Sequence, residues 1–426
     1  MKLTWKRALG AGAVLALALT GCSSGGGSGT SSGSAKAEPP VLRVAMGSPG
    51  EAQIKVWDAI ARQFETEHAG VKVEMNYQDD DLYQTIGLPN LLNGRNAPDI
   101  YFEWVGHRLE TRVKDGFAAD LSAQATKAPL SQTFTADQLA LGQVGGKQYL
   151  IPHTSDVTNV LWFNKRLLAD AGVTPPKTWD ELLAACDTLN GKGITPIASG
   201  NKDLWAAGNF LAHLSSRIVG EQAYDAALSG SAGFDAATWK PAFDAVVQLK
   251  DHKCVNPSAN AITDNEGAQL FFRGKAAMHP IGSWLVSWAI DEAPGLDFDY
   301  VNLPTVTGGK GNQDSVIAVT TGHVVNAKSA NIDLAVAFLA MVNSSTFVDQ
   351  FVKAETTPIV SIGKGSPVDA RSTRLSELTA KAPVVVNPPD TGYDLKRAEA
   401  LYRAVAEVLG GKATPDQALA TLAALK

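Results

Sequence analysis

Residues 41–68 read VLRVAMGSPGEAQIKVWDAIARQFETEH and begin a repeating order of strands and helices. Residues 41–50 alternate apolar side chains and end in Gly-Ser-Pro-Gly, which predicts a strand followed by a turn. Residues 52–68 place Ile54, Trp57, Ile60 and Phe64 at helical spacing. The next segments predict a strand, a proline-interrupted helix and a short strand at residues 71–78, 82–95 and 98–104. This β-α-β-α-β order is typical of a mostly parallel sheet covered by helices.

The alternation of strands and helices continues through the rest of the chain. Residues 145–172 contain two strand-like runs around a polar middle, PHTSDVTN, followed by an amphipathic helix. Thr178 is suited to be the N-cap of the next helix, because Asp180 and Glu181 follow in its first turn. No internal repeat is visible, and the α/β class is favoured over separate α and β domains.

The N-terminus has the features of an export signal. Lys2, Lys6 and Arg7 precede an apolar run at about residues 8–19, which is shorter than the ~20 residues of a membrane span. The segment LTGC at residues 19–22 resembles the lipobox of bacterial lipoproteins, which implies cleavage before Cys22 and a lipid on its sulfur. The alternative is an ordinary signal peptide with an incidental cysteine. The Ser/Gly-rich tract that follows favours a lipid-anchored protein, with a signal peptide at 1–21 and a flexible tether at 22–40.

Charge and composition exclude several kinds of partner. Removal of the three basic signal residues takes the formal net charge from −6 to −9. Such a chain is unsuited to nucleic acid or to electrostatic binding of anionic lipid, so its only membrane attachment is expected to be the lipid on Cys22. The Ala- and Gly-rich composition suits a Gram-positive actinobacterium and the outer face of its cell membrane.

Two cysteines remain in the mature chain. Cys186 and Cys254 form either a disulfide or two buried thiols, because sequence spacing does not show whether they are close in space. Neither is flanked by a His or Cys cluster, so no metal site is expected, and no cofactor motif is present.

Five stretches, in order, resemble the family 1 extracellular solute-binding proteins of carbohydrate ABC transporters, which are related to maltose-binding protein. They are residues 92–104, 145–182, 271–284, 331–345 and 409–419, and they include TPPKTWDEL and GKAAMHPIGSW. The resemblance implies a two-lobed periplasmic-binding-protein type II fold, in which each lobe is a mixed, mostly parallel sheet flanked by helices. It also implies a ligand cleft between the lobes, a carbohydrate ligand, membrane permease subunits as partners, a monomer and no enzymatic activity.

The same resemblance places the chain crossings between lobes near residues 154–158, 304–308 and 343–347. Lobe 1 is then expected at residues 41–153 and 308–346, and lobe 2 at residues 154–307 and 347–426. The polar run PHTSDVTN suits a crossing through a solvated cleft.

Aromatic rings are the first candidates for a sugar site, because indole packs against the apolar C–H faces of a sugar ring and also carries an N–H donor. Trp284 follows a strand end in the GSW segment, whose tryptophan, by resemblance, stacks on sugar. Trp104 follows the strand run PDIYF at residues 98–102, where a loop is expected to open to the cleft, and Trp205 lies in a loop before a helix, where ligand contact and core packing are equally favoured. Of the other tryptophans, Trp57 and Trp162 are expected in the core, and Trp179 is expected to pack locally. Trp288 could lie beside the site, and Trp239 has no assigned role.

Polar candidates lie in loops after strands. Glu51, Glu103, His107, Asp156 and Tyr393 are candidate partners for sugar hydroxyls. The alternative role of Glu51 is to stabilise a helix through its dipole. The alternative for Glu103 and His107 is an ordinary solvated position on the surface. Asp80 and Asp81 are either a solvated acidic turn or a cleft edge.

Two other functions remain as alternatives. One is a binding protein for a non-sugar solute, and the other is a lipid-anchored carbohydrate-active hydrolase, which needs two carboxylates flanking one bond. The G-x-S-x-G match at residues 29–33 lies in the tether without a preceding strand, so it is not a nucleophile elbow. The net negative charge and the aromatic loops favour a neutral sugar over an anion.

Overall fold

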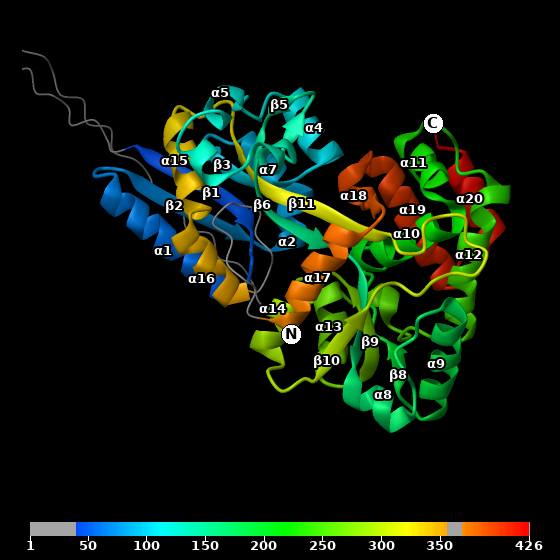
Figure 1. Ribbon diagram of the computed structural model, residues 1–426. Coiled ribbons are helices and arrows are strands. Elements are labelled where there is room, and N and C mark those ends of the chain that lie inside the picture. The colour runs from blue at the N-terminus through cyan, green and yellow to red at the C-terminus, as the bar shows by residue number, and fades with distance from the viewer. Residues whose placement is uncertain (1–39, 356–368, 426) are drawn as a thin grey trace, which may run out of the picture. The chain divides into compact units, whose positions relative to one another are not determined.

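The computed structural model describes residues 40–355 and 369–425. The expected signal peptide, the tether through residue 39 and Cys22 lie outside these residues. The described part contains a six-stranded sheet, a four-stranded sheet and a short hairpin, with helices packed on both larger sheets (Figure 1).

The six-stranded sheet has the order β12-β11-β3-β1-β2, with β6 also paired to β11. The strand β1 runs parallel to β2 and β3, whereas β11 runs antiparallel to β3 and β6 and parallel to β12. The predicted strand-helix-strand start is confirmed. The strands are β1 (Val41–Gly47), β2 (Lys72–Gln78), β3 (Ile100–Trp104), β6 (Leu150–Val157), β11 (Val316–Val325) and β12 (Val385–Val386).

Both faces of this sheet are buried, because successive apolar residues point to opposite sides. Val44 and Ile151 belong to one core, and their neighbours Ala45 and Leu150 belong to another. The first core is closed by α1 (Glu51–Glu67), α15 (Ile332–Val342) and α16 (Ser345–Glu355), which pack on one another (Figure 1). The second face is covered by α3 (Leu88–Leu92) and α4 (His107–Lys114).

The helix predicted at 82–95 is instead three short pieces. They are α2 (Asp80–Leu82), the π-helical turn η1 (Tyr83–Gly87) and α3. A side chain at Gly87 would lie 2.0 Å from Oε1 of Gln78, so glycine permits this close approach. The buried Tyr83 hydroxyl donates to the carbonyl of Phe102 at 2.7 Å, which fixes the turn against β3. Short π-helical turns recur at functional sites, and this one precedes the candidate site.

The remaining elements near this sheet are short. They are α5 (Ser122–Ala125), α6 (Leu130–Thr133), α7 (Ala136–Ala140) and the hairpin β4 (Gln143–Val144) and β5 (Lys147–Gln148).

The four-stranded sheet has the order β10-β7-β9-β8. Its central strand β7 runs antiparallel to β9 and β10, and β8 runs parallel to β9. Leu161 and Phe163 of β7 enter one core and Val160 and Trp162 enter another, so this sheet is also covered on both faces. Its strands are β7 (Val160–Asn164), β8 (Thr195–Ile197), β9 (Ala276–Ile281) and β10 (Phe298–Val301).

Among the helices around the second sheet, α9 begins where the sequence indicates, whereas α10 begins at Trp205, which was expected in the loop before it. Thr178 caps α9 through a capping box with Glu181, which confirms the predicted N-cap. Trp57 and Trp162 are buried, as expected, and Trp239 is buried as well. The helices are α8 (Lys165–Ala171), α9 (Trp179–Gly191), α10 (Trp205–Val219), α11 (Glu221–Ser229), α12 (Ala236–Asp251), η2 (Ala259–Ala261), α13 (Asp264–Phe272), α14 (Leu285–Glu292), α17 (Ala370–Lys381), α18 (Pro389–Gly392), α19 (Leu395–Leu409) and α20 (Pro415–Ala423).

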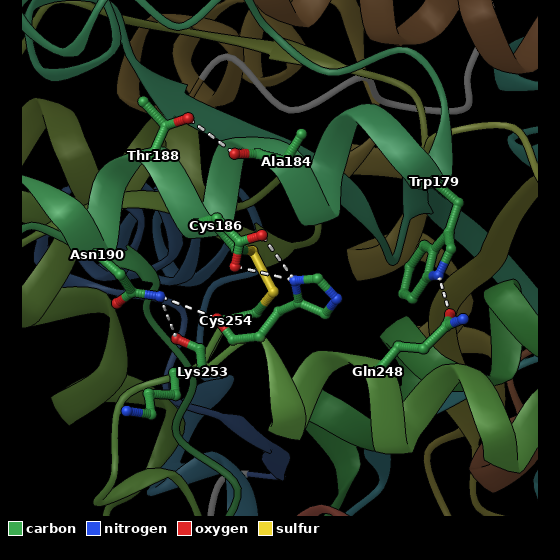
Figure 2. The surroundings of a disulfide bond; sticks show 10 residues. Trp179, Ala184, Cys186, Thr188, Asn190, Gln248, Lys253 and Cys254 are labelled. Carbon is green, nitrogen blue, oxygen red and sulfur yellow. Dashed lines mark hydrogen bonds and ion pairs between the residues drawn. A yellow bond between two sulfur atoms is a disulfide. The ribbon is translucent and has the colours of Figure 1, made fainter.

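Cys186 and Cys254 form a disulfide that joins α9 to the segment after α12 (Figure 2). Both cysteines are fully buried. The indole Nε1 of Trp179 donates to Oε1 of Gln248 at 2.6 Å and links α9 to α12 itself. Trp179 is therefore a packing residue of this region, as expected.

The chain passes from the first sheet to the second through β6. The register against β11 shifts between Thr321 and Gly322, so that His153 has no partner in the ladder. Such a bulge bends a strand. The Nδ1 of His153 lies 3.1 Å from Oδ1 of Asn343, which holds the bulge against the end of α15.

The packing of α16 bears on the boundaries between lobes. Phe347, Val348 and Phe351 lie in the core under the first sheet, whereas a division after residue 346 would separate them from it. We propose that the first lobe extends through residue 355. Gly311 donates from its backbone to Arg217 of α10, so we also propose that residues 308–315 belong with the second lobe.

By length and composition, no single helix among residues 40–355 and 369–425 qualifies as a membrane span. The bent pair α15 and α16 passes the test together, and both helices lie in the core of the first sheet.

Candidate ligand-binding site

Two indole rings lie together at the start of two helices of the second sheet. Trp205 is the first residue of α10, and Trp284 directly precedes α14. Their ring centroids are 6.0 Å apart with the planes tilted by 50°. Both side chains pack against the core of the second sheet and remain partly exposed, so part of each indole contacts solvent. Two tilted, partly exposed indoles are suited to pack against a ligand with apolar C–H faces.

The backbone around each ring is unusual. Leu204, directly before Trp205, has φ of 70°, a conformation that costs a non-glycine residue about 1–3 kcal/mol. A side chain at Gly282 would lie 2.1 Å from the Trp284 ring, so glycine allows this indole to fold back along its own loop. Strained positions of this kind cluster at functional sites.

A hydrogen bond joins this pair to α2, the short helix that follows β2 of the first sheet. The Nε1 of Trp205 donates to Oδ1 of Asp81, in α2, at 3.2 Å. Burial, followed by the charges of Asp203, Asp80 and Asp79, raises the pKa of Asp81 to about 6. The Asp81 carboxylate is therefore a less stable anion than an ordinary surface aspartate.

Asp156 connects the indole pair to the crossing strand β6. Its Oδ1 accepts from Ser283 Oγ at 2.8 Å and its Oδ2 accepts from Thr154 Oγ1 at 2.7 Å. Ser283 also donates its backbone N–H to the carbonyl of Val157 at 2.8 Å. Burial raises the pKa of Asp156, although its side chain retains some exposure. Asp156 thus fixes the loop that carries Trp284.

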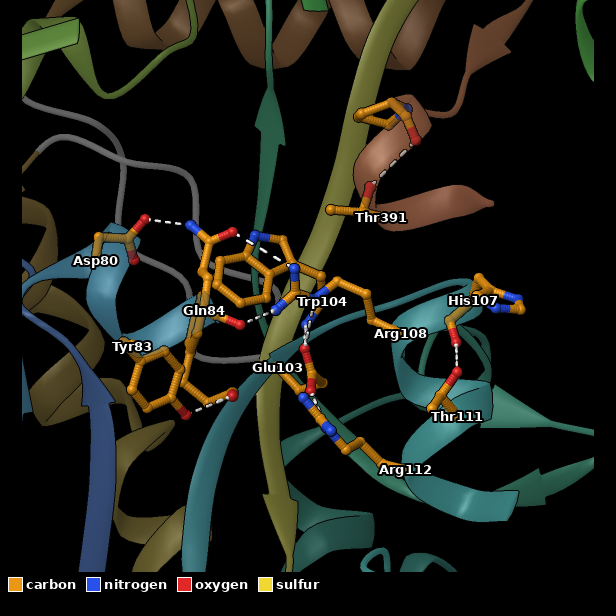
Figure 3. Close-up of polar contacts among 12 residues, drawn as sticks. Asp80, Tyr83, Gln84, Glu103, Trp104, His107, Arg108, Thr111, Arg112 and Thr391 are labelled. Carbon is orange, nitrogen blue, oxygen red and sulfur yellow. Dashed lines mark hydrogen bonds and ion pairs between the residues drawn. The ribbon is translucent and has the colours of Figure 1, made fainter. Parts of the chain in front are cut away.

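A second aromatic group is built around Trp104 at the end of β3 (Figure 3). The guanidinium carbon of Arg108 lies 4.6 Å from the Trp104 ring centroid, a cation–π contact. The same guanidinium lies 3.5 Å from Oε1 of Gln84, and Gln84 Nε2 donates to Oδ2 of Asp80 at 2.5 Å. Since Asp80 and Asp81 are adjacent in α2, this turn connects the Trp104 group with the Trp205–Trp284 pair.

Asp80 is exposed to solvent and is nevertheless surrounded by protein groups that raise its pKa. The main cause is desolvation, and Gln84 and Arg108 partly oppose it. Asp80 therefore has protein partners as well as contact with solvent. Of the two roles weighed for Asp80 and Asp81, these contacts favour the cleft edge.

Glu103 was expected to contact ligand, and its position argues for another role. It is fully buried, and Arg108 Nε and Arg112 Nε lie 3.2 Å and 2.7 Å from its two oxygens (Figure 3). The backbone N–H of Trp104 also donates to Oε1 at 3.1 Å. Because no part of this carboxylate faces solvent, we propose that Glu103 positions Trp104 and Arg108 and does not contact ligand.

His107 and Tyr393 do not join the tryptophans. His107 points away from Trp104 (Figure 3), and its ring nitrogens lie 3.7 Å from Glu110 and 4.0 Å from Asp394. The Tyr393 hydroxyl donates to the Asp225 carboxylate, and the ring belongs to the core of the second sheet. In this arrangement both residues have structural partners.

Glu51 lies exposed in the first turn of α1, where its charge favours the helix dipole. Trp288 is partly buried and packs against the same core as Trp284. The structure thus brings Trp205, Trp284 and Asp156 together, places Trp104 in an adjoining group, and leaves Glu51, His107 and Tyr393 apart from both.

Several residues in or near the two aromatic groups were not foreseen from the sequence. They are Gln84, Arg108, Asp203, Asp264 and Ser283. Ser283 lies beside a predicted tryptophan and was within reach of sequence reasoning. Asp203 raises the pKa of Asp81, and Asp81 and Asp203 raise the pKa of Asp264, across segments far apart in the chain, so only the fold reveals these relations. Among the described residues, no three His, Cys, Asp or Glu side chains are grouped as a metal site.

A model of the family described as bacterial extracellular solute-binding protein matches residues 48–346. The chain belongs to this family. Curated relatives of this solute-binding protein include an ABC transporter extracellular-binding protein of Pyrococcus horikoshii, 24% identical over 78% of this chain and 74% of the relative. A "probable sugar-binding periplasmic protein" of Brucella suis is 28% identical, over half of each chain.

Solved structures show the same fold. One, from work on xylan utilization by Caldanaerobius polysaccharolyticus, has a TM-score of 0.83 and 24% identity, over 90% of this chain and 99% of the other. A chitin oligosaccharide binding protein has a TM-score of 0.82 and 22% identity, over 90% and 97%. The expected α/β fold of the solute-binding family is confirmed.

Proposed function

We propose that this solute-binding protein captures a sugar outside the cell and delivers it to the permease of an ABC importer. The observation that carries the proposal is the partly exposed indole pair Trp205–Trp284 of the second sheet's helices, bordered by two carboxylates from the first sheet's part of the chain, Asp81 after β2 and Asp156 in β6. Relatives and structural neighbours with sugar-binding names support the same ligand class.

The arrangement matches the chemistry of a sugar. The C–H faces of the ring are apolar and pack on indole, whereas the hydroxyls need acceptors and donors. Asp81 and Asp156 supply acceptors, and Arg108 and Gln84 supply donors. A ligand that replaced the Trp205–Asp81 bond with its own bonds would contact both parts of the chain.

This arrangement suggests capture by closure. Asp81 lies in α2, which follows β2 of the first sheet, and Trp205 lies in α10, which follows β8 of the second sheet. A ligand that touches both groups at once stabilises the closed state only through that differential contact. The bulge at His153 in β6 gives the crossing strand a bend about which such movement can occur.

We further propose that export and anchoring place this site on the outer face of the cell membrane. The charged and apolar start of the chain, the cysteine at residue 22 and the Ser/Gly tract support this. The lipid on Cys22 would then be the attachment, and the tether would let the binding unit reach the permease.

The direct test is calorimetry of Trp284→Ala against a panel of mono- and disaccharides. Loss of one stacked indole removes about 1.5–3 kcal/mol of favourable binding free energy from apolar burial, so affinity is expected to fall about 10- to 100-fold. Trp284→Phe retains an aromatic face and should lose less. Tyr149→Ala, a partly buried aromatic in another core, is the control. A wild-type protein that binds no sugar in the panel, or unchanged affinity in Trp284→Ala with a native circular dichroism spectrum, contradicts the proposal.

A further inference from the structure

Two helices that pack on different sheets meet at Gly106. Gly106 is the N-cap of α4, which covers the first sheet. A side chain at this position would lie 2.7 Å from the carbonyl oxygen of Thr391 and 3.1 Å from the Cα of Gly392. Both of these residues belong to α18, which packs against α10 and α19 beside the second sheet. The main chains of α4 and α18 therefore lie so close that no side chain fits between them.

Side chains on the same helices extend this contact. Nε2 of His107, the first residue of α4, lies 4.0 Å from Oδ2 of Asp394, which caps α19. Burial raises the pKa of Asp390 in α18, and the charge of Arg108 partly opposes this rise. Basic side chains of α4 thus face acidic side chains of α18 and α19.

The backbone at Gly106 is of a kind that favours glycine. Its φ of 108° and ψ of −150° combine a positive φ with an extended ψ. Gly50, the N-cap of α1, has a related conformation with φ of 93° and ψ of 158°. A side chain at Gly50 would meet no atom of the described residues within 4 Å, its chain neighbours aside. The two caps share the backbone constraint, and the contact with the second sheet's helices distinguishes Gly106.

This contact lies beside the Trp104 group of the candidate site. Trp104 is two residues before Gly106, and Arg108, whose guanidinium lies over the Trp104 ring, is two residues after it. In the view of Figure 3, Asp80 lies on one side of Trp104 and Thr391 on the other. A change in the distance between α4 and α18 would therefore alter the surroundings of Trp104.

A second contact between helices of the two sheets is of another kind. Trp205 of α10 donates to the side chain of Asp81. Both partners are side chains, which can rotate and exchange this bond for bonds to a ligand. The contact at Gly106 joins main chains held in place by β3 and α18, and atoms packed in this way cannot approach further without overlap.

We propose that the contact of Gly106 with Thr391 sets the closed position of the two lobes around the sugar, so that residue 106 is a positioning residue for binding. The inference rests on the capture by closure proposed above and adds the element that determines how far closure goes. A ligand stabilises the closed state only through contacts with both lobes at once. A side chain at residue 106 would hold α4 and α18 apart and weaken the contacts on one side of the ligand.

The first test uses matched substitutions at the two helix caps. Gly106→Ala and Gly106→Leu share the backbone strain and differ in bulk, and Gly50→Ala and Gly50→Leu are their controls. Titration calorimetry with the sugar that gives the largest thermal shift measures affinity. Small-angle X-ray scattering of the free and saturated proteins measures closure, and thermal melts show whether each variant folds.

The expected result is a loss of affinity that grows with bulk at residue 106. Gly106→Ala should bind about tenfold more weakly, as for the loss of one good polar contact, and Gly106→Leu more weakly still. When saturated, both variants should keep a larger radius of gyration than the saturated wild type. Both Gly50 variants should close and bind as the wild type does. A folded Gly106→Leu protein that closes fully, or Gly50 variants that lose as much affinity, would overturn the inference.

A second test needs no sugar. His107→Cys combined with Asp394→Cys places two thiols where the imidazole and the carboxylate lie 4.0 Å apart. A short bismaleimide should link them within one chain, as peptide mass spectrometry can show. Adding Gly106→Leu should slow the linking, and adding Gly50→Leu should not.

The two tests separate the inference from the function on which it rests. If the cysteine pair is not linked, or is linked equally fast with Gly106→Leu, the inference falls and sugar binding stands on its own evidence. If no sugar binds, the sugar-binding proposal falls, and the cysteine pair still decides whether residue 106 limits the approach of α4 to α18.

Discussion

The substitution Glu103→Gln tests whether the buried carboxylate beneath Trp104 positions the site. Glutamine keeps the shape of the side chain and removes its charge. Arg108 and Arg112, which are 7% and 14% exposed, would then lose the carboxylate that bridges them. Burial disfavours the charged form of Arg112, and the Glu103 carboxylate more than offsets this, so the pKa of Arg112 is raised.

The expected cost follows from these contacts. Removing one partner of a buried ion pair destabilises a protein by about 3–5 kcal/mol, because the remaining charge stays desolvated. Both guanidinium contacts, at 3.2 Å and 2.7 Å, are affected by the one change. We therefore expect a loss of about 3–5 kcal/mol in the free energy of unfolding. Arg108 should also move from the face of Trp104, with a weaker sugar affinity as the consequence.

Urea unfolding followed by circular dichroism measures the stability, and calorimetry measures the affinity. Glu110→Gln removes a carboxylate from the exposed side of α4, the helix that carries Arg108 and Arg112. It is the matched control and should cost less than about 1 kcal/mol. The reasoning is refuted if Glu103→Gln unfolds with a free energy within about 1 kcal/mol of the wild type. A cost of that size is what a surface ion pair would give.

Two further predictions concern pH and anchoring. Because the pKa of Asp264 is about 8 in the folded chain, the folded state binds one more proton than the unfolded state between pH 6.5 and 8, so stability should fall there by about 1.4 kcal/mol per pH unit. Buried His279, whose pKa is lowered to about 4, acts mainly below pH 6.5. The free energy of unfolding of Asp264→Asn should therefore fall less steeply across the upper window than that of the wild type, and an equal slope in the variant assigns the loss to another group. Cys22→Ala should release the protein from cell membranes into the medium, as measured by fractionation and blotting, and full membrane retention would count against the lipid anchor.

Much of the fold was within reach of the sequence. The alternation in residues 41–47 and the helical spacing of Trp57, Ile60 and Phe64 describe β1 and α1 directly. Thr178 with Glu181 identifies the start of α9. These signals are local, and local patterns determine which elements form.

Other features depend on contacts that the sequence does not show. The π-helical turn after Asp80 requires the close approach of Gly87 to Gln78, which only the packed chain contains. The spacing of Cys186 and Cys254 left their pairing open, and the packing of α9 beside α12 brings the two sulfurs together.

The site was predictable in its aromatic part. Strand-end positions and the resemblance of the GSW segment pointed to Trp284, and the structure places Trp205 beside it. Glu103 illustrates what was missed, although a signal existed: Arg108 and Arg112 are one helical turn apart in the next element, so both reach one carboxylate. Asp264 had no such signal.

The most direct test of the central claim is a crystal structure of the protein with the sugar that gives the largest thermal shift. The account predicts a sugar ring packed against Trp205 and Trp284, with polar contacts to Asp81 on one side and to Asp156 or its neighbours on the other. A sugar bound elsewhere, with the two indoles and Asp81 arranged as they are in the free chain, would contradict it.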